Sequence, residues 1–354
     1  DSEMTKLSAG DWVEVKSREE ILATLDSRGQ LDHLPFMPEM FQFCGGRFQV
    51  WSRAHKTCDT VSKTGGRWMP DTVHLKELRC DGQAHGGCGA GCLIFWKEAW
   101  LRPLDPQRTA AGPGSAAQGG CATEQDVWSG TREPGDADDP TYICQTTAIP
   151  QATSLARWWD IRQYLEDYTS GNVELRQLLG SAAYFAFHAL VRRTRRYQPR
   201  AAESLIQLYD RYQARVGGVP YPRKFGTIPA GQRTPSEPLH LQPGELVRVK
   251  THLRVLDTLD TNNRNRGMYF DAEEVPFCGH TYRVRSRVDK LIVEQTGKLR
   301  DLKDNNVILE GVYCKAYYSE KRVFCPRALY SIWRETWLER VPDEAAPLEL
   351  KAEG

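Results

Sequence analysis

A glycine-rich stretch from Arg79 to Trp100, RCDGQAHGGCGAGCLIFWKEAW, gathers three cysteines and one histidine. Its thiols are Cys80, Cys88 and Cys92, and its imidazole is His85. Glycines let a backbone turn tightly, while thiolate and imidazole groups supply lone pairs that hold a metal ion. The stretch therefore predicts a metal site in a loop that leads, through Cys92, into an aromatic helical segment.

Three further candidate ligands, Cys44, His55 and Cys58, precede this loop. The spacings His55-x2-Cys58 and Cys88-x3-Cys92 can bring both side chains of each pair to one ion from a turn. Thiolate with imidazole favours zinc, which is the leading prediction. Four thiolates, Cys58 with the three of the loop, also suit an iron–sulfur cluster whose sulfurs accept hydrogen bonds from glycine amides, and this is the alternative.

Two kinds of catalysis are compatible with these ligands. Zinc with three protein ligands leaves a fourth position for water, whereas zinc with four is structural. Alternatively, a thiol at a helix start has its pKa lowered by the helix dipole, which would make Cys92 a nucleophile. His55 or His85 would then be the base, and Asp81 or Glu98 would orient it.

The chain contains an internal repeat. A shift of 234 positions takes Cys44 to Cys278 and aligns residues 10–80 with residues 244–314 without a gap. Roughly twenty aligned positions are identical, against about four or five expected from average residue frequencies.

The repeat continues beyond a three-residue insertion. There Cys88 meets Cys325, and the segment WKEAWL meets WRETWL. Two copies of one module therefore span roughly residues 8–103 and 242–342.

Each copy predicts short strands with a period of two. The first strand is GDWVEVK or GELVRVK, the second is RFQVWSR or TYRVRSR, and the third is VHLKEL or VILEGVY. Short alternating strands joined by turn residues predict a small antiparallel barrel, with a helix at its C-terminal end. The opening Gly-Asp-x-Val-x-Val resembles the start of an SH3-like barrel of the kind found in KOW modules, a resemblance of about seven residues per copy that implies fold alone.

The two copies differ in their ligands. Three thiols occur at matched positions in both copies: Cys44 with Cys278, Cys80 with Cys314, and Cys88 with Cys325. Four ligands occur only in the first copy, namely His55, Cys58, His85 and Cys92, and the second copy holds Asp289, Ile292, an insertion and Leu329 there. Matched thiols suggest groups that meet in space, although free cysteines are often small buried hydrophobes. We expect the first copy to bear the metal and the second to be structural.

Two regions separate the copies. Residues 104–154 are rich in Pro, Gly, Ala and Asp, which predicts an irregular connection. Two islands within it carry Cys121 and Cys144, and we expect them to fold back on the first module. Residues 155–241 contain three helical patterns up to about residue 216, followed by a proline-rich linker. The fold class is therefore α+β, with two β-barrel modules separated by a helical region.

Composition limits the partners and the location. The 354 residues are 40% hydrophobic and 26% charged with a net charge of +1, which gives no general attraction to nucleic acid. No segment approaches the length of a transmembrane helix and no signal peptide is visible, so a cytoplasmic location is expected. The ten cysteines, interspersed with histidine in a long chain, favour metal ligation over disulfides.

Two function classes follow from these features. The first is a metal- or thiol-dependent enzyme of specialised metabolism, that is, of biosynthesis, which acts on a small substrate near the first module. It predicts an open coordination position and a pocket with His55, His85 and Cys92. The second is a non-catalytic scaffold or binding module with structural zinc, whose barrels bind protein or nucleic acid. It predicts a closed four-ligand site and an exposed apolar or basic face. The enzyme is slightly favoured because the loop holds more ligands than one structural ion needs.

Overall fold

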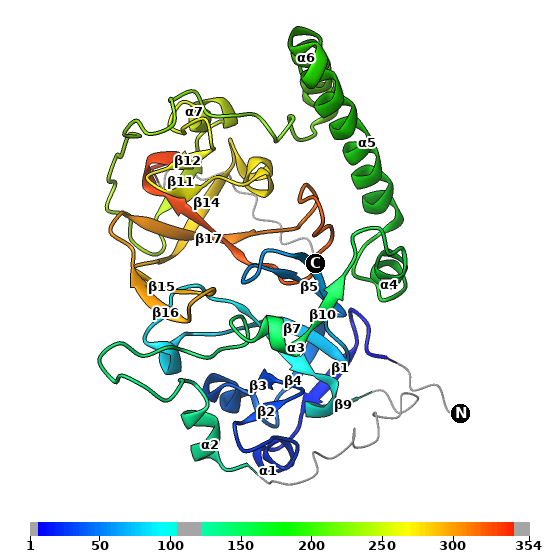
Figure 1. Ribbon diagram of the computed structural model, residues 1–354, viewed down its shortest axis with the longest axis vertical. Helices are drawn as coiled ribbons and strands as arrows, with labels where there is room; N and C mark the ends of the chain where they lie inside the picture. Colours follow the sequence, from blue (N-terminus) through cyan, green and yellow to red (C-terminus); the bar gives the residue numbers. More distant parts are fainter. Residues whose placement is uncertain (1–5, 105–121, 343–354) are drawn as a thin grey trace. The chain divides into compact units, whose positions relative to one another are not determined.

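The computed structural model describes residues 6–104 and 122–342 (Figure 1), so Cys121, the first residue of one predicted island, lies outside the described part. The chain divides into two compact units. Unit 1 comprises the chain up to Gly180 together with Lys290–Asp301 and Lys315–Leu329, and unit 2 comprises Ser181–Asp289, Leu302–Cys314 and the chain from Tyr330. The second copy of the repeat therefore contributes a hairpin and a loop to unit 1.

Unit 1 contains an antiparallel five-stranded sheet in the order β8-β7-β4-β1-β9. Its strands are β1 (Trp12–Val15), β4 (Arg47–Arg53), β7 (Thr72–Arg79), β8 (Leu93–Lys97) and β9 (Leu101–Pro103). The alternation predicted for the first strand is confirmed, because Val13 and Val15 are both fully buried. The sheet positions the cysteine-rich loop, which connects β7 to β8.

Unit 2 contains a second five-stranded sheet with the equivalent order, β18-β17-β14-β11-β19. Its strands are β11 (Leu246–Val249), β14 (Thr281–Arg287), β17 (Asn306–Tyr313), β18 (Tyr330–Arg334) and β19 (Leu338–Arg340). Both sheets have a register shift at the same aligned position, between Val50 and Ser52 in β4 and between Val284 and Ser286 in β14. The fold is thus mixed α+β with two related β modules.

The helix predicted at the C-terminal end of each module is wrong. Residues 96–101 and 332–338 instead form the end of a strand, one 3-10 turn and the start of another strand. The 3-10 turns are η3 (Glu98–Trp100) and η5 (Glu335–Trp337). The two tryptophans of each segment have helical spacing, but the turn between the strands brings both into the core, where Trp96 and Trp100 are fully buried. Pairing of β8 with β7 decides the conformation, because tertiary context overrides a short local period.

Two longer hairpins lie in unit 1, one from each copy. The first is β5 (Lys56–Asp59) with β6 (Gly65–Trp68), which also pairs with β10 (Ser154–Ala156), and the second is β15 (Lys290–Val293) with β16 (Lys298–Asp301). Each copy also has a two-residue hairpin: β2 (Gln30–Leu31) with β3 (Leu34–Pro35), and β12 (Arg264–Asn265) with β13 (Met268–Tyr269).

Helices alternate with the strands along the chain. The α-helices are α1 (Arg18–Leu22), α2 (Glu124–Ser129), α3 (Ile149–Ala152), α4 (Arg162–Thr169), α5 (Leu175–Tyr197), α6 (Pro199–Val216) and α7 (His252–Leu256). The other 3-10 helices are η1 (Pro38–Phe43), η2 (Gln83–His85) and η4 (Ala272–Phe277). The helical patterns predicted up to about residue 216 correspond to α4, α5 and α6, and Figure 1 shows α5 as one long uninterrupted helix. In the described ranges, every helix is too short or too polar to cross a bilayer.

Aromatic clusters fill the matching interiors of the two modules. In unit 1 the ring of Phe36 meets the ring of Trp100 edge-on at 5.2 Å, and in unit 2 Phe270 meets Trp337 in the same way at 5.2 Å. Edge-to-face pairs of fully buried rings stabilise a rigid core. The loops that carry the thiols are therefore anchored on rigid scaffolds.

Candidate metal centre

The cysteine-rich loop is closed at its base and turned by glycines. Cys80 directly follows β7, and its amide donates a hydrogen bond to Cys92 O at 2.9 Å, just before β8 begins. Gly82 has a φ of 74°, and a Cβ atom there would lie 2.1 Å from Cys88 O. Only glycine fits this position, so the loop folds back tightly between its first and last cysteines.

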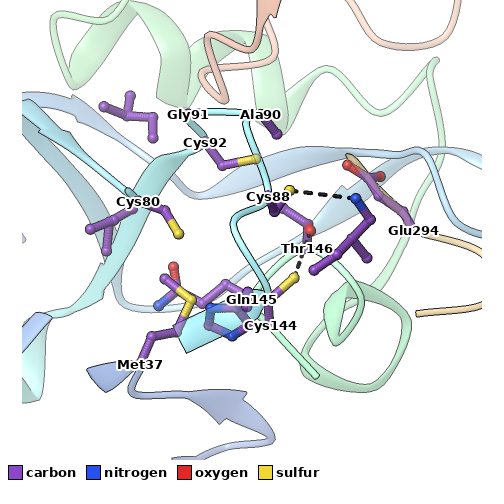
Figure 2. Close-up of a pocket in the computed structure, with 14 residues that line it drawn as sticks. Met37, Cys80, Cys88, Ala90, Gly91, Cys92, Cys144, Gln145, Thr146 and Glu294 are labelled. Atoms are coloured by element: carbon purple, nitrogen blue, oxygen red, sulfur yellow. Dashed lines mark hydrogen bonds between the residues drawn. The ribbon is translucent and has the colours of Figure 1, made fainter. Parts of the chain in front are cut away.

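Four thiols line one small cavity at this loop (Figure 2). Cys80, Cys88 and Cys92 come from the loop itself, and Cys144 comes from the segment before α3. The cavity volume is about 40 Å³, whereas one water needs roughly 10–15 Å³ in the same measure. Apart from these sulfurs, the walls include apolar side chains such as Ile292 of the β15–β16 hairpin.

Cys144 was outside the ligand set predicted from the sequence, although its island was expected to fold back on the first module. Its neighbour Gln145 holds it there: Gln145 accepts a hydrogen bond from Phe95 N at 2.8 Å and donates to Phe95 O at 2.8 Å and to Pro35 O at 3.1 Å. The sequence signal was a thiol inside an otherwise linker-like composition. That signal does not say which other thiols Cys144 meets.

The four thiols surround more space than one ion fills. Zinc holds thiolates at about 2.3 Å in a tetrahedron, so the sulfurs of a zinc site lie about 4 Å apart. In residues 6–104 and 122–342, the group whose ligand atoms all lie within 4.8 Å of one another is Glu39, Cys80 and His85. No three of the cavity thiols form such a group in this part of the chain.

The tighter group is already held by its own hydrogen bonds. His85 Nδ1 lies 2.7 Å from Glu39 Oε1, and His85 Nε2 lies 3.1 Å from Ile143 O. Both ring nitrogens of His85 are therefore engaged by protein oxygens and do not face the cavity thiols. The same Glu39 oxygen accepts from Ala84 N at 3.1 Å and from the Cys80 thiol at 3.8 Å. In this arrangement, Glu39 and His85 position the loop.

The carboxylate of Glu39 is charged in this setting. Burial alone would raise the pKa of Glu39, but the hydrogen bond and the charge of His85 hold that pKa below its ordinary value. A buried carboxylate that accepts three donors fixes the start of the loop. Glu39 thereby orients the Cys80 thiol at the edge of the cavity.

Cys92 has a different environment from the one the sequence predicted. It precedes strand β8 and not a helix, so no helix dipole lowers the pKa of its thiol. Burial instead raises the pKa of Cys92 to about 12. The helix start predicted at Cys92 is therefore wrong, and burial raises the pKa of its thiol although the charge of Arg327 opposes the shift.

Backbone amides are directed at two of the other sulfurs. Burial raises the pKa of both Cys80 and Cys88, but the amide of Gly82 opposes the shift at Cys80. At Cys88 the increase in pKa is opposed by the amide of Ile292, whose nitrogen lies 3.4 Å from the Cys88 sulfur, and by the amide of Ala90. Amides that donate to sulfur favour the thiolate form. The cavity thus has features that stabilise thiolate ligands once a cation balances their charge.

His55 lies in a separate buried cluster. Its Nε2 is 3.1 Å from Gln163 O and 3.4 Å from an oxygen of Asp167, which also pairs with Lys56 at 2.5 Å. Burial lowers the pKa of His55 to about 4. His55 therefore does not line the four-thiol cavity with His85 and Cys92.

The two remaining predicted ligands also lie elsewhere in unit 1. Cys44 is partly buried against the hydrophobic core. Cys58, on β5, contacts Cys325 and Arg327 of the loop 315–329. Of the seven residues in the predicted ligand set, the structure brings Cys80, Cys88, Cys92 and His85 to the cavity walls.

Neither a scan against protein-family models nor a search of curated proteins finds a match to this chain. The function therefore has to be argued from the residues of the site.

Proposed function

We propose that the chain is a metal-binding protein in which Cys80, Cys88, Cys92 and Cys144 hold one metal centre. The observation that carries the proposal is the convergence of these four thiols on a single cavity. Metals with an affinity for sulfur match a wall of four thiols.

The spacing of the thiols favours an iron–sulfur cluster over the zinc predicted from the ligand types. The thiols are too widely spread for one tetrahedral ion, whereas a multi-iron cluster holds its four thiolates further apart. The amides that donate to Cys80 and Cys88 are also the kind of contact that tunes a cluster. A cluster supplies one-electron chemistry, and the residues around it fix its ligands and exclude water.

The closed ligand set favours a role other than catalysis at the metal. An enzyme of specialised metabolism with an open metal position needs a ligand set with a vacancy and a pocket for its small substrate. Here four thiols face a cavity of about 40 Å³, which is too small for such a substrate. We infer a centre that transfers electrons or stabilises the loop, in a protein that acts through a protein partner.

Two further parts of the proposal concern the fold and the location. The strand order β8-β7-β4-β1-β9, repeated in unit 2, supports closed SH3-like barrels that arose by tandem duplication. A reducing compartment such as the cytoplasm is part of the proposal, and it is supported by several cysteines of the described ranges that carry thiols, including the four at the cavity.

Metal analysis of the protein purified without oxygen tests the proposal. We expect iron and acid-labile sulfide, a brown absorption band, and loss of both in Cys80→Ser and Cys144→Ser. Cys44→Ala is the matched control, because Cys44 is a half-buried thiol of the same unit outside the cavity, and it should keep the metal.

The outcomes separate the alternatives. One zinc per chain, lost in the same two variants, would keep the metal site and reject the cluster. Absence of any metal, or equal loss in Cys44→Ala and Cys144→Ser, would reject the site itself.

A further inference from the structure

Two thiols outside the four-thiol cavity lie against each other in unit 1. Cys58 is on strand β5, and Cys325 is on the loop 315–329. The amide of Cys58 donates a hydrogen bond to the Cys325 sulfur at 3.1 Å. The chain therefore brings together two thiols that are 267 positions apart in sequence.

The repeat supplies an internal comparison for this contact. The amide of Ile292 donates to the Cys88 sulfur at 3.4 Å. Ile292 aligns with Cys58 and Cys88 aligns with Cys325, so the hairpin of each copy makes the same contact with the cysteine loop of the other copy. Only the contact between Cys58 and Cys325 has sulfur on both sides.

A buried arginine lies beside this thiol pair. Arg327 is 1% exposed, and its guanidinium lies 3.8 Å from the Cys58 sulfur. It also donates to Thr60 Oγ1 at 2.7 Å and to Glu294 Oε1 at 2.8 Å, which hold it in place. A fixed cation at this distance favours a thiolate. The hydrogen bond from Cys325, followed by the charge of Arg327, lowers the pKa of Cys58 to about 6 against the effect of burial.

We propose that Cys58 and Cys325 are a redox-active pair that closes reversibly into a disulfide, with Arg327 as a positioning residue. The geometry carries the proposal: the Cys325 sulfur accepts the hydrogen bond of the Cys58 amide at 3.1 Å, and the Arg327 guanidinium lies 3.8 Å from the Cys58 sulfur. None of the three residues is among the four proposed ligands of the metal centre, although the charge of Arg327 also acts on Cys92.

The reaction needs a two-electron oxidant, for which a hydroperoxide suffices. The Cys58 thiolate attacks one peroxide oxygen, the O–O bond breaks, and for hydrogen peroxide the leaving group is hydroxide. The Cys325 thiol loses its proton and attacks the Cys58 sulfenic acid, and the S–S bond forms as the S–OH bond breaks. The Cys325 proton and one hydroxide form water. One thiolate, one thiol and one hydrogen peroxide thus give one disulfide, one water and one hydroxide.

Peptide mapping of the full-length protein tests this pair. Reduced protein is treated with one equivalent of hydrogen peroxide, denatured in an alkylating agent and digested, with metal content measured in parallel. We expect a linked peptide that contains Cys58 and Cys325 and disappears after dithiothreitol. Cys44→Ala, which removes a thiol of the same unit away from the pair, should give the same linked peptide.

Variants distinguish the proposed pair from chance oxidation. In Cys325→Ser, the Cys58 sulfenic acid has no resolving thiol and should accumulate as a dimedone adduct. In Arg327→Gln, the pH midpoint of disulfide formation should move to a higher pH than in the wild-type protein, because the guanidinium beside the Cys58 sulfur is removed, and each pKa unit gained lowers the thiolate fraction about tenfold once the pKa exceeds the pH.

Three outcomes would overturn the proposal. They are recovery of Cys58 and Cys325 as separate alkylated peptides after oxidation, a preferred link to any other cysteine, and an unchanged pH midpoint in Arg327→Gln. A metal content unchanged in Cys325→Ser keeps the two proposals distinguishable.

Discussion

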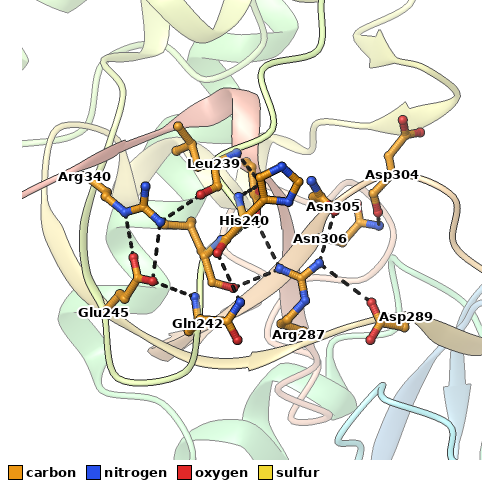
Figure 3. Close-up of polar contacts among 12 residues, drawn as sticks. Leu239, His240, Gln242, Glu245, Arg287, Asp289, Asp304, Asn305, Asn306 and Arg340 are labelled. Atoms are coloured by element: carbon orange, nitrogen blue, oxygen red, sulfur yellow. Dashed lines mark hydrogen bonds and ion pairs between the residues drawn. The ribbon is translucent and has the colours of Figure 1, made fainter.

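The two modules share a polar anchor but differ in their cysteine loops. In the first module, Arg53 donates to Leu7 O at 2.8 Å and to Glu98 Oε1 at 2.6 Å. Figure 3 shows the equivalent residue of the second module, Arg287, which donates to Leu241 O at 2.9 Å and lies 3.3 Å from Glu335 Oε1. The aligned residues make the same contacts, so the scaffold has been retained in both copies.

The cysteine loops of the two copies differ at one aligned position. Ala90 lines the four-thiol cavity of the first copy, and Arg327 occupies the aligned position in the second copy. Where the second copy places a guanidinium beside Cys58, the first copy leaves a cavity among thiols. The comparison teaches that the same loop position can hold an arginine, as in the second copy, or a small residue beside a cavity, as in the first copy. The cavity of the first copy is the site that we propose for a metal.

The largest expected effect comes from exchanging this position. Ala90→Arg would place a guanidinium in the cavity, and we expect complete loss of bound metal, because the side chain takes up the space and its charge repels a second cation. Metal analysis provides the readout, and hydrogen exchange in β7 and β8 checks that the sheet is intact. Ala90→Ser, which adds one oxygen atom, should keep the metal. Full metal content in Ala90→Arg would contradict the comparison.

The polar anchors should differ in strength although their contacts match. Glu335 is 1% exposed, and besides Arg287 it accepts the amides of Leu239, His240 and Leu241 at 2.5, 2.8 and 2.8 Å. In Glu335→Gln the new amide group must face one of these donors, so we expect a loss of about 3 kcal/mol in the free energy of unfolding.

Glu98→Gln is the matched change in the first module. Arg53 keeps a second carboxylate there, Glu166 at 3.0 Å, so the expected loss is about 1.5 kcal/mol. Denaturant-dependent hydrogen exchange in each sheet measures both values. A larger loss of unfolding free energy in Glu98→Gln than in Glu335→Gln would mean that the anchor of the first module is the stronger one, which contradicts our expectation.

Part of this architecture was predictable from local pattern. Val13, Val15 and their repeats Val247 and Val249 alternate with polar residues, and a period of two has one simple structural meaning, a half-buried strand. The spacing of Trp96 and Trp100 is compatible with two structures. An α-helix places residues four apart on one face, and a strand followed by one 3-10 turn also directs both side chains to the same side. Pairing with β7 selects the strand, and such pairing is not encoded in the segment itself.

The site was less predictable because it is assembled from distant segments. The glycines and cysteines of the loop are neighbours in sequence, so their convergence followed from spacing. Cys144 and Ile292 reach the cavity only through the tertiary fold, and no local period relates them to Cys88. His85 is the opposite case: its proximity was predicted, but its ring nitrogens are engaged by Glu39 and Ile143.

A buried histidine should make the first module more sensitive to acid. His74 on β7 is fully buried, and burial lowers its pKa to about 3 from the ordinary 6.5. Below pH 6.5 the unfolded chain binds a proton that the folded chain does not, so stability falls as the pH falls, by about 2 kcal/mol between pH 7 and pH 5.

The second module has Ile308 at this position, which supplies the matched substitution. His74→Ile should remove that part of the pH dependence, as followed by urea unfolding at several pH values. The buried His55 and His252, whose pKa values burial lowers to about 4, keep the remainder. An unchanged slope in His74→Ile would show that His74 is not the source.

The smallest expected effect tests whether the two cores are equivalent. Trp100 Nε1 donates to Thr24 Oγ1 at 3.1 Å, and Trp337 Nε1 donates to Thr258 Oγ1 at the same distance. Thr24→Val and Thr258→Val keep the shape but leave a buried indole N–H without its acceptor, so each should cost about 1 kcal/mol. Because each hydroxyl also donates at 2.7 Å to a backbone carbonyl three residues earlier, the two losses should agree within error. Unequal losses, measured by hydrogen exchange in each sheet, would mean that the cores have diverged in packing despite their matched contacts.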